Sequence, residues 1–141
     1  MGPVSTEPLD MDSLFAAMGG HETFARLVRR FYAGVRTDEL LAPMYPHDDW
    51  AGAEDRLRMF LEQYWGGPTT YSERRGHPML RRRHMPFTVT PAARDRWLTH
   101  MRVAVDELGL PAESEALLWD YLVRAAHAMV NADSPGRTPL I

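Results

Sequence analysis

The chain has 141 residues, a mass of 16.1 kDa and a formal net charge of −3, and this length suits one domain with a single core. It has no cysteine, which excludes disulfides, iron–sulfur clusters and thiolate-bound metals. The weakly acidic balance gives no reason to expect a nucleic-acid partner. No apolar run reaches the length of about 18 residues that spans a membrane, and residues 1–10 lack the basic and apolar parts of a signal peptide. We therefore expect a cytoplasmic protein.

The two ends of the chain differ in composition from the middle. Residues 1–10 and 132–141 are rich in Pro, Ser, Gly and charge, which predicts flexible tails around a domain of residues 11–131. Within that domain apolar residues recur at helical spacing nearly throughout, and no alternating pattern is long enough for a useful strand. The sequence therefore predicts an all-α fold.

The first part of the domain predicts a short helix followed by a long one. Asp12 or Ser13 can cap a helix over residues 14–18, which Gly19-Gly20 ends. A helix over residues 21–35 follows. Its apolar residues form one stripe, which predicts a buried face made of Phe24, Leu27, Val28, Phe31, Tyr32 and Val35.

A turn and a further helix come next. Asp38 opens a single turn through Leu41, and two prolines then bracket Tyr45 in an irregular corner. Asp48-Asp49 can cap a helix that Gly66-Gly67-Pro68 ends. The expected inner face of this helix consists of Trp50, Ala53, Leu57, Phe60, Leu61 and Tyr64.

The second part of the domain has a long irregular stretch before its two long helices. Residues 69–76 predict a loop that can include one helical turn, and residues 78–84 a helix of about two turns. Thr90-Pro91 then begins a helix that Gly109 ends, and the last helix covers residues 112–131. The expected inward residues are Trp97, Met101, Ala104, Val105 and Leu108, then Leu118, Leu122, Ala125, Ala126 and Met129. A compact helical domain seldom carries as much irregular chain as residues 66–90 without a functional reason, and a prosthetic group that fills the place of a longer helix is such a reason.

His84 is the candidate metal ligand of this stretch. Pro86 disfavours helical backbone at Met85, so the short helix should end near His84. One imidazole nitrogen can then coordinate a metal while the other donates to a freed carbonyl such as that of Leu80. The alternative is that His84 only caps the helix end, where the helix dipole favours its positive form.

The residues around this stretch could hold a haem, which needs an axial ligand, an apolar slot and cations near its propionates. His84 can serve as the ligand. Arg56 and one of Arg81, Arg82 and Arg83 could reach the propionates, although each of these arginines can equally be a solvated surface charge. The slot could be built by Leu57, Phe60, Leu61, Leu80, Phe87 and Met101.

From Gly19 to Asn131 the chain resembles the group II truncated haemoglobins, which have the short two-over-two helical globin fold. The pieces that carry this resemblance are long and occur in order. They are Gly19-Gly20, Arg30-Phe31-Tyr32, Tyr45-Pro46, Ala51-Gly52-Ala53-Glu54, the run from Arg56 to Pro68, Tyr71-Ser72, Arg75-Gly76-His77-Pro78, Leu80-Arg81, Arg83-His84, Pro86-Phe87, Arg94-Asp95, Trp97-Leu98 and Ala125-Ala126-His127.

The resemblance implies a haem b with His84 as the proximal iron ligand. It also implies that Tyr32, Tyr45 and Trp97 line the distal face, where the ligand binds. Ala53 would then occupy the usual distal gate position, with Leu57 one turn further on. The matching segments also carry Tyr71 and Arg83, which we expect at the cofactor.

Hydrogen-bond donors on the distal face would stabilise O₂, which acquires partial negative charge on haem. A donor to a charged acceptor contributes roughly 1.5–3 kcal/mol, so two of them slow O₂ release by about two to four decades. We therefore expect tight binding of O₂ and of other diatomic ligands such as CO and NO, which suits chemistry or scavenging better than transport. NO dioxygenase and peroxidase-like activities stay open, as do an unknown reductase and a homo-oligomer. The alternative is a haem-free helical module that acts through protein contacts.

Overall fold

The computed structural model describes residues 11–45, 48–76 and 89–130. All regular secondary structure in these residues is helical, which confirms the predicted all-α fold. The helices are α1 (Met11–Ala17), α2 (Gly20–Val35), the 3-10 helix η1 (Ala42–Met44), α3 (Trp50–Tyr64), α4 (Thr70–Arg75), α6 (Pro91–Leu108) and α7 (Ala112–Met129). None of these helices is both long and apolar enough to cross a membrane.

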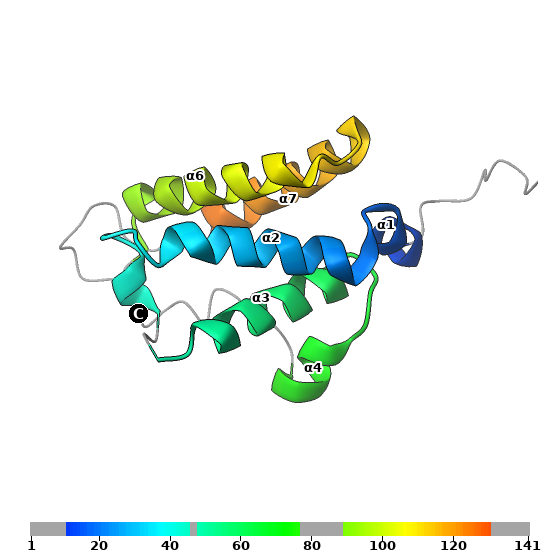
Figure 1. Ribbon diagram of the computed structural model, residues 1–141, viewed down its shortest axis with the longest axis horizontal. Helices are drawn as coiled ribbons and strands as arrows, with labels where there is room; N and C mark the ends of the chain where they lie inside the picture. The colour runs from blue at the N-terminus through cyan, green and yellow to red at the C-terminus, as the bar shows by residue number, and fades with distance from the viewer. Residues whose placement is uncertain (1–10, 46–47, 77–88, 131–141) are drawn as a thin grey trace, which may run out of the picture.

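The long helices form two stacked pairs. Figure 1 shows α2 crossing the middle of the molecule, with the antiparallel pair α6 and α7 on one side and α3 on the other. Helix α4 packs against α3, and α1 packs against α2. The C-terminal end of α2, η1 and the first turns of α3 and α6 all lie at one end of the molecule (Figure 1).

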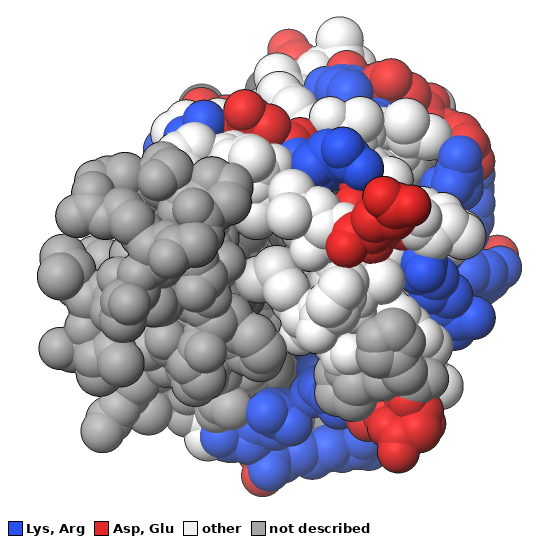
Figure 2. Space-filling model, turned by 90° about the vertical axis from the view of Figure 1, so that its left-hand side faces the viewer, with Lys and Arg blue, Asp and Glu red and all other residues white. Residues whose placement is uncertain are grey.

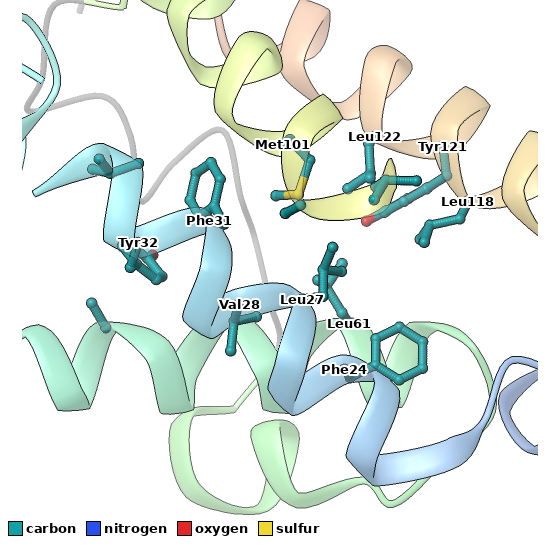
Figure 3. Packing of buried hydrophobic residues seen from close by; sticks show 14 of the residues in the cluster. Phe24, Leu27, Val28, Phe31, Tyr32, Leu61, Met101, Leu118, Tyr121 and Leu122 are labelled. Atoms are coloured by element: carbon teal, nitrogen blue, oxygen red, sulfur yellow. The ribbon is translucent and has the colours of Figure 1, made fainter. Parts of the chain in front are cut away.

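The apolar stripe of α2 forms the centre of the core. Every residue of the predicted stripe is buried, and Phe24, Leu27, Phe31 and Val35 are fully so. Side chains from α3, α6 and α7 meet it there, among them Leu61, Met101 and Leu118 (Figure 3). Each such side chain contributes about 1.5–3 kcal/mol of transfer free energy, so this stripe fixes how the helix pairs pack.

Local capping residues set the ends of α3 and α6 as the sequence predicts. The Asp49 carboxylate accepts a hydrogen bond from the backbone N–H of Gly52 at 3.1 Å. The Thr90 hydroxyl accepts one from Ala93 at the same distance, with Pro91 in the first turn. Gly109 ends α6 with a φ of 64°, which an L side chain rarely adopts.

The structure corrects several of the predicted boundaries. Helix α1 begins at Met11, so neither Asp12 nor Ser13 is its cap. Residues 70–75 form α4 instead of a loop with one turn, because Gln63 of α3 bonds to Ser72 through both its amide oxygen and its amide nitrogen. The predicted short helix over residues 78–84 lies outside the described residues, and so do Leu80, Arg81, Arg82, Arg83, His84 and Phe87.

The inner face of α3 differs from the predicted one at its C-terminal end. Tyr64 is 40% exposed, although its spacing places it on the apolar face. Its ring instead stacks on Tyr121 of α7, with the ring centroids 3.9 Å apart. Glu62 is buried and holds His21 at 2.8 Å and Arg58 at 3.1 Å, so an ion-pair network replaces apolar packing where α3 ends near the start of α2.

Candidate functional site

A cavity of about 260 Å³ lies between the two helix pairs and is lined by residues of α2, α3, α4, α6 and α7. Most of the described residues that the sequence predicts for the site line this cavity. They are Tyr32, Tyr45, Ala53, Arg56, Leu57, Phe60, Leu61, Tyr71 and Trp97. Met101 is the exception: it is fully buried in the core and is not among the lining residues.

Tyr32, Tyr45 and Trp97 form a polar group in the wall of the cavity. Tyr32 projects from α2, Tyr45 follows η1 in extended backbone, and Trp97 projects from α6. The rings of Tyr32 and Tyr45 pack edge to face, with centroids 5.5 Å apart. The Phe31 ring packs edge to face on the Trp97 ring, with the centroids 5.1 Å apart. Two successive residues of α2 therefore contact Tyr45 and Trp97.

The Tyr45 hydroxyl interacts with the Tyr32 hydroxyl and with the Trp97 indole. Burial raises the pKa of both tyrosine hydroxyls. The interaction between them adds to that rise at Tyr32 and opposes it at Tyr45. The interaction with Trp97 also opposes the rise at Tyr45.

This arrangement places three hydrogen-bond donors at the cavity. Each tyrosine hydroxyl carries one hydrogen, and the Trp97 indole carries one. Because Tyr32, Tyr45 and Trp97 line the cavity, these donors can reach a molecule bound there.

The remaining walls of the cavity are mostly apolar. Ala53 is 4% exposed and presents only a methyl group. Phe60 of α3 packs edge to face on Tyr71 of α4, with the ring centroids 5.6 Å apart. The opposite wall is apolar apart from Tyr121, which the sequence analysis did not place at the site. It comprises Val89 and Ala93 before and within α6, and Tyr121, Leu122, Ala125, Ala126 and Met129 of α7.

Three arginines line the cavity beside these apolar walls. Arg56 pairs with Asp49 at 3.2 Å, and Arg94 pairs with Asp95 at 2.9 Å. The Arg75 guanidinium lies 5.9 Å from the ring centroid of Tyr71. Only Arg56 was predicted from helix spacing; Arg75 and Arg94 lie in segments that carry the family resemblance, but no periodicity singles them out. Figure 2 shows basic and acidic groups interspersed around an uncharged strip on the end of the molecule where α2 ends.

These features fit a haem. The cavity offers apolar walls for a porphyrin, arginine cations for its propionates and a cluster of hydrogen-bond donors for a ligand of the iron. The expected axial ligand, His84, lies outside the described residues.

Comparison with known proteins gives the same result. Residues 13–131 match the bacterial-like globin family. The chain is 43% identical over 112 residues to the group 2 truncated hemoglobin YjbI of Bacillus subtilis, covering 79% of this chain and 84% of that protein. Its fold superposes with a TM-score of 0.84 on a thermostable hemoglobin from Thermobifida fusca, at 63% identity and covering 86% and 98% of the two chains. The TM-score is 0.83 for the group II truncated hemoglobin of Bacillus anthracis, at 36% identity and covering 93% and 98%.

The two helix pairs around an apolar cavity are those of a globin, and the chain belongs to the bacterial-like globin family. Its predicted resemblance to the group II truncated haemoglobins is confirmed. The protein is thus a haem-binding globin that binds oxygen, and the alternative of a haem-free helical module is not favoured.

Proposed function

We propose that this globin binds O₂ tightly on a haem b, with His84 as the proximal ligand and Tyr45 as the principal distal donor. The haem supplies reversible binding of O₂ and other diatomic ligands. The observation that carries the proposal is the position of Tyr45 in the cavity wall, between Tyr32 and Trp97. Its interactions with both neighbours hold its side chain in place, so its O–H is preorganised to donate to a ligand that carries partial negative charge.

The protonation of these donors supports the same function. Burial raises the pKa of the Tyr32 and Tyr45 hydroxyls above the ordinary value near 10. Both side chains therefore keep their protons throughout the physiological pH range. The apolar walls around them exclude water, and a hydrogen bond is stronger in such surroundings than in water.

We assign the other cavity residues to holding the cofactor. Leu57, Phe60, Leu61 and Tyr71 would contact the porphyrin, and the small side chain of Ala53 would leave a direct path to the iron. Arg56, Arg75 and Arg94 would bind the propionates. The sequence adds Leu80, Arg83 and Phe87 to the cofactor contacts.

The proposal also includes a redox activity toward NO or peroxide. Conversion of O₂ and NO to nitrate takes up one electron, so this activity would need a reductase as partner. The tyrosine and indole donors support it, because proton donors beside a ligand assist cleavage of an O–O bond. Tight binding also favours such chemistry over oxygen transport.

The test begins with reconstitution of the purified chain with hemin. The wild type should develop an intense Soret band with one equivalent of hemin, whereas His84→Ala should lose haem faster to an acceptor protein. Stopped-flow measurement should then show faster O₂ dissociation for Trp97→Phe than for the wild type. Equal haem retention by His84→Ala would overturn the ligand assignment, and an unchanged rate for Trp97→Phe would overturn the distal assignment.

A further inference from the structure

A buried carboxylate outside the cavity links the elements that carry Tyr45 and Trp97. The Asp38 side chain is 2% exposed and lies in the turn after α2. Its carboxylate accepts hydrogen bonds from Arg96 Nε at 3.0 Å, Arg96 Nη2 at 3.2 Å and His100 Nε2 at 2.7 Å. It also accepts from the backbone N–H groups of Leu40 at 2.9 Å and Leu41 at 3.2 Å.

On one side, this carboxylate fixes the chain that leads to Tyr45. Its two backbone hydrogen bonds close the turn over residues 38–41. The Asp38 carbonyl accepts the N–H of Ala42 at 2.8 Å, and the Ala42 carbonyl accepts the N–H of Tyr45 at 3.1 Å. Asp38 is therefore connected to the backbone of Tyr45 through a short, continuous series of hydrogen bonds.

On the other side, the carboxylate holds α6 at the turn that carries Trp97. Arg96 is the residue before Trp97, and His100 lies three residues after it, on the neighbouring turn of the helix. The hydrogen bonds to both residues therefore bracket Trp97. They fix the position of this turn of α6 relative to the segment that carries Tyr45.

The close approach of His100 depends on a glycine of α2. A Cβ added at Gly34 would clash with the His100 imidazole. His100 thus lies directly against α2 while its Nε2 reaches Asp38. This contact joins α2, which carries Tyr32, to the same cluster.

We propose that Asp38, with Arg96 and His100, is a positioning group that sets the position of Trp97 relative to Tyr45 and thereby the strength of ligand binding. The inference rests on the proposed distal role of Tyr45. Burial raises the pKa of Asp38, but hydrogen bonds from Arg96, His100 and two backbone amides outweigh it and hold this pKa well below its usual range, so Asp38 keeps its charge at neutral pH.

The test compares Asp38→Asn with the wild type in three measurements on the haem-loaded protein. These are the O₂ dissociation rate, the C–O stretching frequency of the CO complex, and the indole N–H proton shift of Trp97, assigned by its loss in Trp97→Phe. We expect Asp38→Asn to raise the dissociation rate by about three- to tenfold, equivalent to loss of part of one hydrogen bond. We also expect it to shift the C–O frequency in the direction that Trp97→Phe does and to move the indole resonance.

Two comparisons separate positioning from a general loss of stability. Asp120→Asn removes a carboxylate from an ion pair with Arg124 that is 68% exposed on both sides, and it should leave all three measurements unchanged. In the Trp97→Phe background, Asp38→Asn should change the dissociation rate by less than about twofold, because the interaction through which it acts is already absent.

His100 provides a second route if Asp38→Asn does not fold. His100→Leu removes a donor to Asp38 and should reproduce the three changes, whereas His100→Gln can still donate and should restore most of the wild-type values. The inference is overturned if His100→Leu, or a folded Asp38→Asn, leaves all three measurements at wild-type values while Trp97→Phe and Tyr45→Phe alter them. If those two variants also leave the dissociation rate unchanged, the proposed distal function itself fails.

Discussion

The rings of Tyr32 and Tyr45 pack edge to face with their centroids 5.5 Å apart, and the Tyr45 hydroxyl also interacts with the Trp97 indole. These contacts bring α2, the corner after η1 and α6 together in the wall of the cavity. Because Tyr45 interacts with both of the other side chains, we expect the three to contribute unequally to ligand binding.

Tyr45→Phe should accelerate O₂ dissociation more than Tyr32→Phe. The first change removes the O–H that we assign as the principal donor to the ligand, which is worth roughly 1.5–3 kcal/mol or about one to two decades in rate. The second removes only the hydroxyl of a neighbour that packs against Tyr45, so we expect less than about tenfold. Stopped-flow displacement of O₂ by CO measures both rates. A larger effect of Tyr32→Phe would mean that the roles of the two tyrosines are exchanged.

The O₂ dissociation rate should stay flat from about pH 7 to about pH 10. Burial raises the pKa of the hydroxyls of Tyr32 and Tyr45 above their ordinary value near 10, so both remain protonated donors through this range. Rapid-mixing measurements at a series of pH values test this. An acceleration with a midpoint below pH 10, absent from Tyr45→Phe, would contradict it.

Asp38 should stabilise the fold at neutral pH and lose that effect in acid. Its pKa in the folded protein is lowered, so its contribution is fully present above the unfolded value near 4. The contribution declines as the pH falls below about 4, toward the folded pKa. Arg96 and His100 face the carboxylate from α6. Asp38→Asn should reduce the free energy of unfolding by about 1–3 kcal/mol at pH 7 and by less at pH 3.

Urea unfolding at several pH values measures this difference. Asp120→Asn serves as the control, because its ion pair with Arg124 is exposed and should contribute less than about 1 kcal/mol at any pH. A difference between Asp38→Asn and the wild type that does not diminish on acidification would show that the charge of Asp38 is not the source of its effect.

Arg56→Gln should release haem faster than the wild type. Arg56 lines the cavity and its side chain is 32% exposed, so its attraction for a propionate is partly screened by water. An exposed ion pair contributes about 0.2–1 kcal/mol, which corresponds to an increase in rate of up to about fivefold. Transfer of haem to an excess of apomyoglobin measures the rate. Arg124 lies outside the cavity lining, so Arg124→Gln should release haem at the wild-type rate. Haem release from Arg56→Gln at that same rate would contradict the assignment of Arg56 to a propionate.

The sequence predicted the features that depend on local pattern. The stripe of α2 from Phe24 to Val35 is buried as its spacing requires, and Asp49 and Thr90 cap their helices as their positions suggest. Such features follow from interactions within a few residues. The exposure of Tyr64 could not be predicted in this way, because its ring stacks on Tyr121 of α7, which is distant in the sequence.

Contacts between distant segments account for the other gaps. Nothing in the spacing of Asp38, Arg96 and His100 shows that they meet, since helix packing alone brings α6 to the end of α2. Arg75 and Arg94 lie in segments that carry the family resemblance, but the sequence predicted no role for them. Their place in the cavity lining shows that they belong to the site. Met101, which the sequence assigns to the cofactor slot, lies in the core cluster together with the stripe of α2 and is not among the residues that line the cavity.

The most direct measurement of the central claim is the O₂ dissociation rate of the double variant Tyr45→Phe/Trp97→Phe. If these two side chains hold the ligand, their removal should raise the rate by about two to four decades over the wild type, with the haem content unchanged. A rate within about twofold of the wild type would contradict the account, because the ligand would then be held by something other than the hydrogen bonds of Tyr45 and Trp97.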